Sequence, residues 1–178
     1  MYDSRVHHRR SIRLPGYDYS RPGAYAVTVC TYVKRSVFGE IVEGEVILND
    51  VGQMIQDTWE QIPGHYPGCG LDAFVVMPNH VHGIILITAA PTLTGQARGP
   101  APTTLSLPDL VHRFKSLTTA RYREGVVTHG WRALDGKLRQ RNYYEHIIRN
   151  DYELEKMREY IATNPVRWET DWENLLGP

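Results

Sequence analysis

Two histidines separated by one residue are the side chains in this chain best suited to metal chemistry. His80 and His82 lie within residues 74–87, between two runs of strand-forming residues. Side chains alternate between the two faces of a strand, so both imidazoles share one face while Val81 points into the core. Two imidazoles on one face can bind a divalent metal. The spacing alone also fits two exposed histidines on an ordinary strand, so a metal site needs a further ligand.

Two polar residues on a predicted C-terminal helix supply the missing groups. Asp151 begins this helix, which spans residues 152–164 and ends before Pro165. Tyr160 and Asn164 are four residues apart and therefore share a helix face. A phenol can act as a nucleophile, and an amide oxygen can bind a metal. Each residue alone also fits an ordinary role, at the rim of an amphipathic helix or at its C-terminus.

The remaining pattern predicts strands and helices that alternate irregularly along the chain. Residues 71–77 and 80–88 are two strands too close for a crossover helix, so they pair antiparallel. An antiparallel sheet with helices packed on one face follows, plus the C-terminal helix that carries Tyr160, and this is an α+β fold. The other expected elements are a strand at 25–33, a hairpin at 40–48, a helix from Asn49 or Asp50 to Ile62, a helix from Pro108 to Glu124 capped by Ser106 and stopped by Gly125, and an extended segment at 137–148.

Length and composition indicate a single domain. The 178 residues suit one substantial core, and we expect a basic arm at 1–22, one domain at 23–170 with a flexible loop at about 89–106, and a tail at 171–178. No apolar run is long enough to cross a bilayer, and the N-terminus lacks a signal-peptide core. With only Cys30 and Cys69 present, we expect a reduced cytoplasmic protein with no membrane partner.

The formal net charge of zero hides two basic segments, and this favours a polyanionic partner. Residues 110–150 hold nine Lys and Arg against three Asp and Glu, and residues 1–35 hold seven against two. Ordinary solvated charge explains the same pattern equally well. The candidate phosphate or base contacts are Arg113, Lys115, Arg121, Arg123, Arg139, Arg141 and Tyr143.

The chain resembles the REP-associated tyrosine transposases in three blocks. These are residues 77–83 (Met-Pro-Asn-His-Val-His-Gly), 140–150 (Gln-Arg-Asn-Tyr-Tyr-Glu-His-Ile-Ile-Arg-Asn) and 158–168 (Arg-Glu-Tyr-Ile-Ala-Thr-Asn-Pro-Val-Arg-Trp). That family belongs to the single-tyrosine branch of the HUH (His-hydrophobic-His) endonucleases. The resemblance covers roughly residues 15–170. One departure is visible, because Arg139 stands where the resemblance leads us to expect a tryptophan.

The resemblance implies a fold, an activity and a role for each site residue. It implies a ferredoxin-like antiparallel sheet, with His80, His82 and Asn164 as ligands of Mg²⁺ or Mn²⁺ and Tyr160 as the catalytic nucleophile. The implied activity is transposition by a DNA endonuclease, which cleaves and rejoins single-stranded DNA near hairpin-forming palindromic repeats through a covalent phosphotyrosine. The implied assembly is a monomer or a homodimer.

Three alternatives compete with this interpretation. Tyr144, or its neighbour Tyr143, is the second candidate nucleophile, although only one of the two can face the metal from a strand. A histidine-triad nucleotide hydrolase needs a third histidine at position 84, which is Ile84 here. A non-catalytic module that binds single-stranded DNA or RNA on the same kind of sheet is the remaining alternative.

Overall fold

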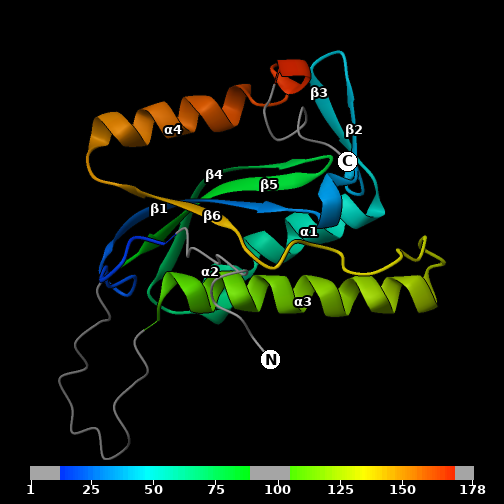
Figure 1. Cartoon of the computed structure of the whole chain (residues 1–178), viewed down its shortest axis with the longest axis horizontal. Helices are drawn as coiled ribbons and strands as arrows, with labels where there is room; N and C mark the ends of the chain where they lie inside the picture. The colour runs from blue at the N-terminus through cyan, green and yellow to red at the C-terminus, as the bar shows by residue number, and fades with distance from the viewer. Residues whose placement is uncertain (1–12, 89–104, 171–178) are drawn as a thin grey trace, which may run out of the picture.

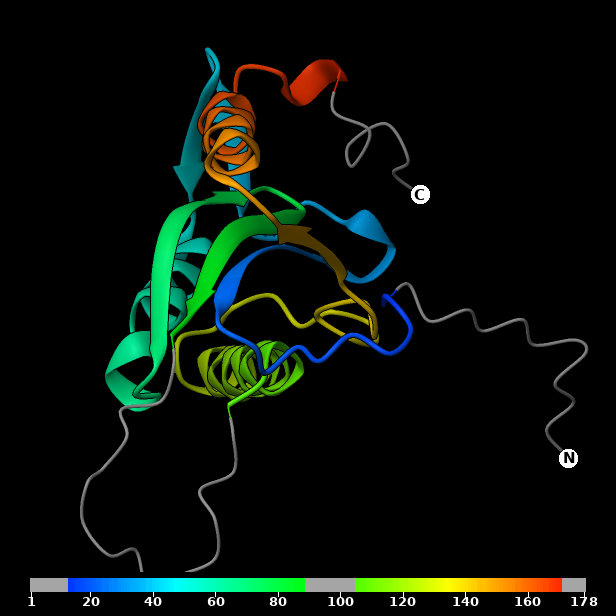
Figure 2. The ribbon, with the colours of Figure 1, turned by 90° about the vertical axis from the view of Figure 1, so that its left-hand side faces the viewer.

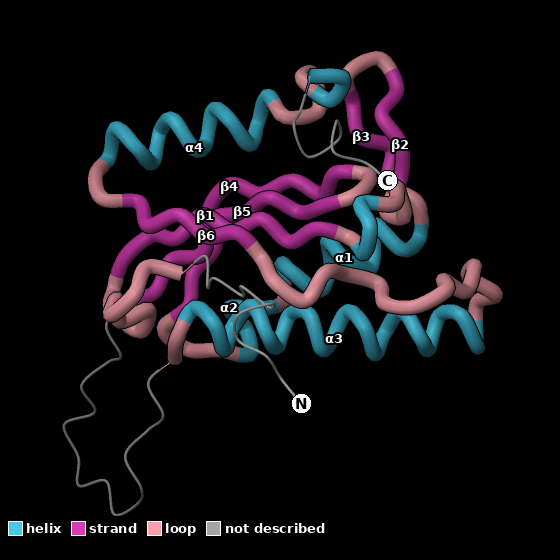
Figure 3. The backbone as a smooth tube through the Cα atoms, viewed as in Figure 1, coloured by secondary structure: helices cyan, strands magenta, loops and turns pink. Residues whose placement is uncertain are grey.

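Four strands form an antiparallel sheet at the centre of the computed structural model, which describes residues 13–88 and 105–170 (Figures 1 and 3). The strands are β1 (Gly23–Cys30), β4 (Cys69–Met77), β5 (His80–Ile87) and β6 (Tyr144–Ile148). Their order is β4-β5-β1-β6, and every neighbouring pair is antiparallel. The predicted α+β fold with a ferredoxin-like sheet is confirmed.

The helices cover both faces of this sheet. They are α1 (Asp50–Glu60), α2 (Ile62–His65), α3 (Leu107–Thr128) and α4 (Asp151–Thr163). Short 3₁₀ turns occur at Tyr32–Lys34 and Trp168–Thr170, and a separate hairpin consists of β2 (Gly39–Val42) and β3 (Glu45–Leu48). Figure 2 shows α4 on one side of the curved sheet and α3 on the other, with α1 and α2 on the side of α3.

Strand alternation divides the apolar residues between two cores. The larger core lies between the sheet and helices α1 and α3, and it includes Val81, Ile85 and Phe114. The smaller core lies under α4, where Ile161 packs with Ile84 of β5. Since His80 and His82 alternate with Val81, both histidines lie on the α4 side. The helix that carries Tyr160 therefore covers the histidine-bearing face.

Trp59 of α1 connects both long helices of the larger core to the sheet. Its fully buried ring stacks on Phe74 of β4 at 5.8 Å between centroids and meets Phe114 of α3 edge-on at 5.2 Å. The ring also lies directly on Gly83, where a Cβ atom would come within 2.3 Å of a ring carbon. The absence of a side chain at Gly83 lets the indole pack against β5.

Several element boundaries differ from the sequence-based expectation. Helix α3 continues through Gly125 to Thr128, and the Trp131 ring packs where a Gly125 side chain would lie. The first strand ends at Cys30, and Val33 and Lys34 then adopt positive φ angles of 49° and 51°. In the extended segment 137–148, only β6 joins the sheet, while Arg139 forms an isolated bridge with Thr31. The loop predicted at 89–106 lies largely outside the described residues.

The described part of the N-terminal arm packs against the domain. Tyr19 is buried in the larger core, and its hydroxyl donates a hydrogen bond to Glu145 Oε1 at 3.0 Å. Residues 1–12 and 171–178 lie outside the described residues, and the proposed domain boundaries stay a prediction. Within 13–88 and 105–170, no helix combines the length and apolarity needed to span a bilayer.

Replacing Gly83 with alanine should lower the free energy of unfolding by about 1–3 kcal/mol, because the Trp59 ring must move to admit the methyl group. Urea denaturation would measure this change. The control is Gly64→Ala, where the added Cβ meets nothing within 4 Å. It should leave the midpoint unchanged or slightly raised. Equal midpoints for Gly83→Ala and the wild type would contradict the packing described here.

Candidate active site

Four side chains predicted from separate parts of the sequence lie together between β5 and α4. The His80 and His82 rings are 4.4 Å apart between centroids, at an angle of 74°. The Tyr160 ring lies 5.2 Å from that of His82. Asn164, the residue that ends α4, is 1% exposed, and its side chain interacts with His80. The structure therefore brings two imidazoles, an amide and a phenol into one cluster.

An ion pair and a helix cap set the position of α4 over the sheet. Arg158 donates two hydrogen bonds to the Asp72 carboxylate of β4, at 2.8 and 2.6 Å. The guanidinium holds the pKa of Asp72 below its usual value. At the other end of α4, the Asn150 side chain accepts a hydrogen bond from Glu153 N at 2.9 Å. These contacts orient the helix so that Tyr160 faces the histidines.

Both histidines use Nδ1 in a hydrogen bond, which directs Nε2 into the cluster. His80 Nδ1 bonds with Asn79 Oδ1 at 2.6 Å, and His82 Nδ1 bonds with Thr28 Oγ1 at 2.8 Å. Metal-binding histidines in proteins are held in this way by the second ring nitrogen. Among the described residues, His82 Nε2 and Asn164 Oδ1 are buried without a hydrogen-bond partner. A bound cation would satisfy both atoms.

Burial keeps both imidazoles neutral at physiological pH. It lowers the pKa of His82 to about 4 and, together with the nearby His82, lowers the pKa of His80 well below its usual value. Neutral imidazole is the form that binds metals, so no proton needs to leave either ring before binding at pH 7. Over the described ranges, no group of three or more His, Cys, Asp or Glu side chains is placed to hold a metal. The group that Asn164 adds to the two imidazoles is an uncharged amide.

The two adjacent tyrosines of the 140–150 block face opposite sides of the sheet. Tyr143 is buried in the larger core, away from the histidines. Tyr144 is 43% exposed and shares a cross-strand row with Thr28 and His82 on the α4 side. Tyr144 and Tyr160 both line a cavity of about 260 Å³ beside His82. The Tyr160 ring contacts that of His82 edge-on.

The candidate DNA-binding residues do not form a single surface. Arg121 bonds to Thr58 and Gln61 near the end of α1, and Arg113 lies over the Tyr66 ring. Arg139 is buried against α3. Together with Arg139, the others line a cavity between α3 and the segment before β6, and these are Lys115, Arg123, Arg141 and Tyr143.

Sequence reasoning missed three residues that surround the histidines. Asn79 and Thr28 hold the two Nδ1 atoms, and Trp168 lies 6.2 Å from the His80 ring and nearly parallel to it. Asn79 and Trp168 are within the blocks that carry the family resemblance, so the signal was present. No sequence signal marks Thr28, because its contact with His82 depends on how β1 pairs with β5.

Comparison with known proteins establishes a family and a fold. No family model matches the chain. A Haemophilus influenzae protein, described only as uncharacterized, is 38% identical over 179 residues, which cover 96% of this chain and 95% of that protein. The chain belongs to the same family as this protein. A REP-associated tyrosine transposase, solved bound to a REP hairpin, aligns with a TM-score of 0.59 over 88% of this chain and 74% of its own length. At 20% identity, this similarity shows a shared fold.

If the cluster binds a metal, His82→Ala should weaken Mn²⁺ binding at least tenfold, as removal of second-shell partners alone commonly does. Thr28→Val should also weaken it, because the hydrogen bond that orients the His82 ring is lost. Isothermal titration calorimetry would measure both. His112→Ala, an exposed histidine on α3, serves as control and should bind like the wild type. Equal affinity for His82→Ala and the wild type would contradict the ligand assignment.

Proposed function

We propose that this protein is a metal-dependent endonuclease and transposase that cleaves and rejoins single-stranded DNA near hairpin-forming palindromic repeats. The observation that carries the proposal is the contact of the Tyr160 ring with His82, next to His80 and Asn164. The shared fold with a transposase bound to a DNA hairpin supports it. The sequence resemblance in three blocks points to the same activity.

In this proposal, His80, His82 and Asn164 would hold Mg²⁺ or Mn²⁺. Three protein ligands leave coordination positions open for a phosphate. When bound, the cation would offset the negative charge that builds on the phosphate oxygens during cleavage. Nitrogen ligands favour Mn²⁺ over Mg²⁺ in intrinsic affinity.

Tyr160 would act as the nucleophile in cleavage. Its hydroxyl oxygen attacks the phosphorus, the new bond forms between these atoms, and the bond from phosphorus to one deoxyribose oxygen breaks. The phenol proton passes to water, and the departing oxygen takes a proton from water. Because the phosphotyrosine keeps one phosphoester bond for each one broken, a second DNA end can attack it and be joined without ATP.

The α4 helix disfavours the alternative of a non-catalytic nucleic-acid module. Such modules use an open sheet face for base stacking. Here α1 and α3 pack against one face and α4 packs against the other. A buried pair of oriented imidazoles is also unnecessary for binding alone.

A labelled single-stranded oligonucleotide with a hairpin should form a metal-dependent protein–DNA adduct that survives denaturation. Tyr160→Phe should abolish the adduct, because it lacks the attacking oxygen, whereas Tyr144→Phe should retain it. His80→Ala should abolish cleavage while the circular dichroism spectrum and DNA binding remain largely unchanged. An adduct that persists in Tyr160→Phe but is lost in Tyr144→Phe or Tyr143→Phe would show that the nucleophile is wrongly assigned.

DNA binding should weaken steeply as salt rises, because phosphate contacts release counterions. Arg123→Gln and Arg141→Gln, both exposed beside the cavity, should each reduce the log–log salt slope by about one. Arg121→Gln should leave the slope unchanged, since this guanidinium is bonded to α1. Fluorescence anisotropy over a salt series gives these slopes. A flat wild-type response would remove the basic segment from the proposed interface.

A further inference from the structure

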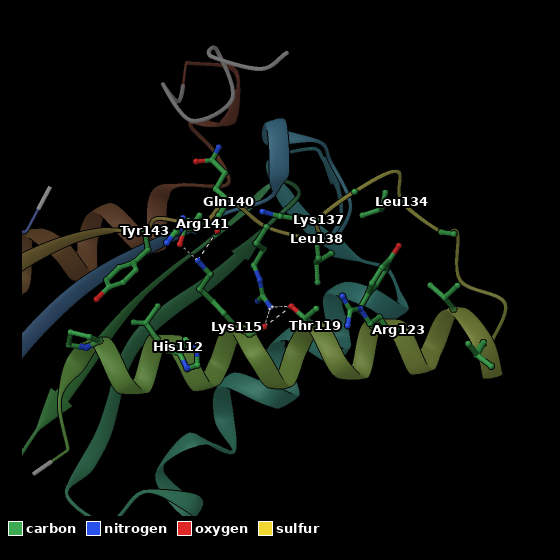
Figure 4. Close-up of a pocket in the computed structure, with 18 of the residues that line it drawn as sticks. His112, Lys115, Thr119, Arg123, Leu134, Lys137, Leu138, Gln140, Arg141 and Tyr143 are labelled. Carbon is green, nitrogen blue, oxygen red and sulfur yellow. Dashed lines mark hydrogen bonds between the residues drawn. The ribbon is translucent and has the colours of Figure 1, made fainter. Parts of the chain in front are cut away.

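A second cavity lies on the opposite face of the sheet from the histidine cluster. It has a volume of about 760 Å³ and opens between α3 and residues 131–143, the segment that leads into β6 (Figure 4). In Figure 4, side chains from both elements point into the space between them. The volume falls within the range of small-molecule binding sites in proteins.

The lining of this cavity is strongly basic. Six Lys and Arg side chains and one histidine line it, and none of its lining residues is Asp or Glu. The cations are Arg13, Lys115, Arg123, Lys137, Arg139 and Arg141. A concave site lined by charges of one sign concentrates its field on a ligand of opposite charge. The cavity therefore favours anions.

Arg139 is the most buried of these cations. It is 5% exposed, and its guanidinium lies 5.1 Å from the centre of the Phe114 ring. Nη2 donates hydrogen bonds to Lys115 O at 2.8 Å and to the Thr118 hydroxyl. Nε and Nη1 are buried without a hydrogen-bond partner among the described residues. A buried guanidinium with unsatisfied donors is costly unless an anion accepts from it.

Lys115 places a second cation close to Arg139. Its ammonium donates to the carbonyls of Gln140 and Arg141, both at 2.7 Å. Burial, followed by the charge of Arg139, lowers the pKa of Lys115 to about 8. The ammonium remains mostly protonated at pH 7. The two cations repel each other, and a bound anion would relieve that repulsion.

We propose that this cavity binds a single nucleotide, with its phosphate against Arg139 and Lys115. The phosphate matches the cationic lining, and the base matches the apolar wall formed by Val111, Val126 and Leu134. Arg139 stands where the family resemblance leads us to expect tryptophan, so this cation is a departure from that expectation. The nucleotide comes either from an unpaired position in a DNA strand or from the free pool. The proposal does not rest on the proposed nuclease function, because binding needs neither metal nor Tyr160.

Calorimetric titration of the full chain with thymidine 5′-monophosphate tests the site. We expect saturable binding, with thymidine at least tenfold weaker because it lacks the phosphate. Arg139→Met should weaken nucleotide binding by about 10–100-fold, the effect of losing hydrogen bonds from a charged donor. Arg113→Met, on α3 but outside the cavity, is the control and should bind like the wild type.

A second variant keeps the test informative if Arg139→Met unfolds. The double variant Arg123→Gln, Lys137→Gln changes two exposed rim residues, and it should weaken nucleotide binding at least about fivefold while melting like the wild type. Unchanged binding in this variant and in a folded Arg139→Met would overturn the proposal. Equal affinity for thymidine and its monophosphate, or no saturable binding of either, would also overturn it. Arg139 would then be a structural residue that fixes segment 139–142 to α3.

A four-nucleotide single strand distinguishes the two sources of the ligand. If the strand binds more tightly than the monophosphate and loses that affinity in Arg139→Met, the nucleotide belongs to DNA. If the monophosphate binds and the strand does not, the ligand is a free nucleotide. The same titrations with Tyr160→Phe should match the wild type, so failure of the nuclease proposal and failure of this one are separable.

Discussion

The attachment of α4 to the sheet is the constraint on which the candidate active site depends. Without this attachment, His80 and His82 would still be neighbours on β5, but Tyr160 and Asn164 would lie far from them. Apolar contacts under α4 supply the stabilisation, while the Arg158–Asp72 pair supplies orientation. A solvent-exposed ion pair contributes little to stability, but its bidentate geometry restricts the rotation and shift of the helix. The position of Tyr160 is therefore set by a residue on β4.

The parts of the site that depend on local periodicity could be predicted from the sequence. Strand alternation indicated that His80 and His82 share a face, and helical spacing indicated the same for Tyr160 and Asn164. What brings the two pairs together is tertiary, since Asp72 and Arg158 are 86 residues apart in the chain. The family resemblance supplied this juxtaposition, whereas no pattern within the sequence could have supplied it. The fold class followed from element order, because adjacent strands with a short connection leave one way to pair.

Charge patterning was less informative, because it does not distinguish buried cations from solvated ones. The block 110–150 contains exposed arginines, arginines that are bonded to neighbouring elements, and one arginine in the interior. On α3, the apolar Leu117 is 38% exposed, while its polar neighbour Thr118 is fully buried and bonds to Arg139. The buried position is polar because the Thr118 hydroxyl accepts a hydrogen bond from Arg139. A buried guanidinium needs acceptors nearby, and the α3 backbone and hydroxyls provide them.

The chemistry of the two cavities explains why they lie on opposite faces of the sheet. The histidine cluster uses neutral donors, since imidazoles with lowered pKa values and an amide carry no charge at pH 7. α4 can bury such uncharged groups, whereas carboxylates in their place would bring unpaired negative charges into the same interior. The cations lie instead around an open cavity beside α3, where water solvates the exposed ones. The two environments stay apart where the chain enters β6, because Tyr143, just before the strand, lines the cationic cavity, whereas Tyr144, its first residue, lies on the histidine side.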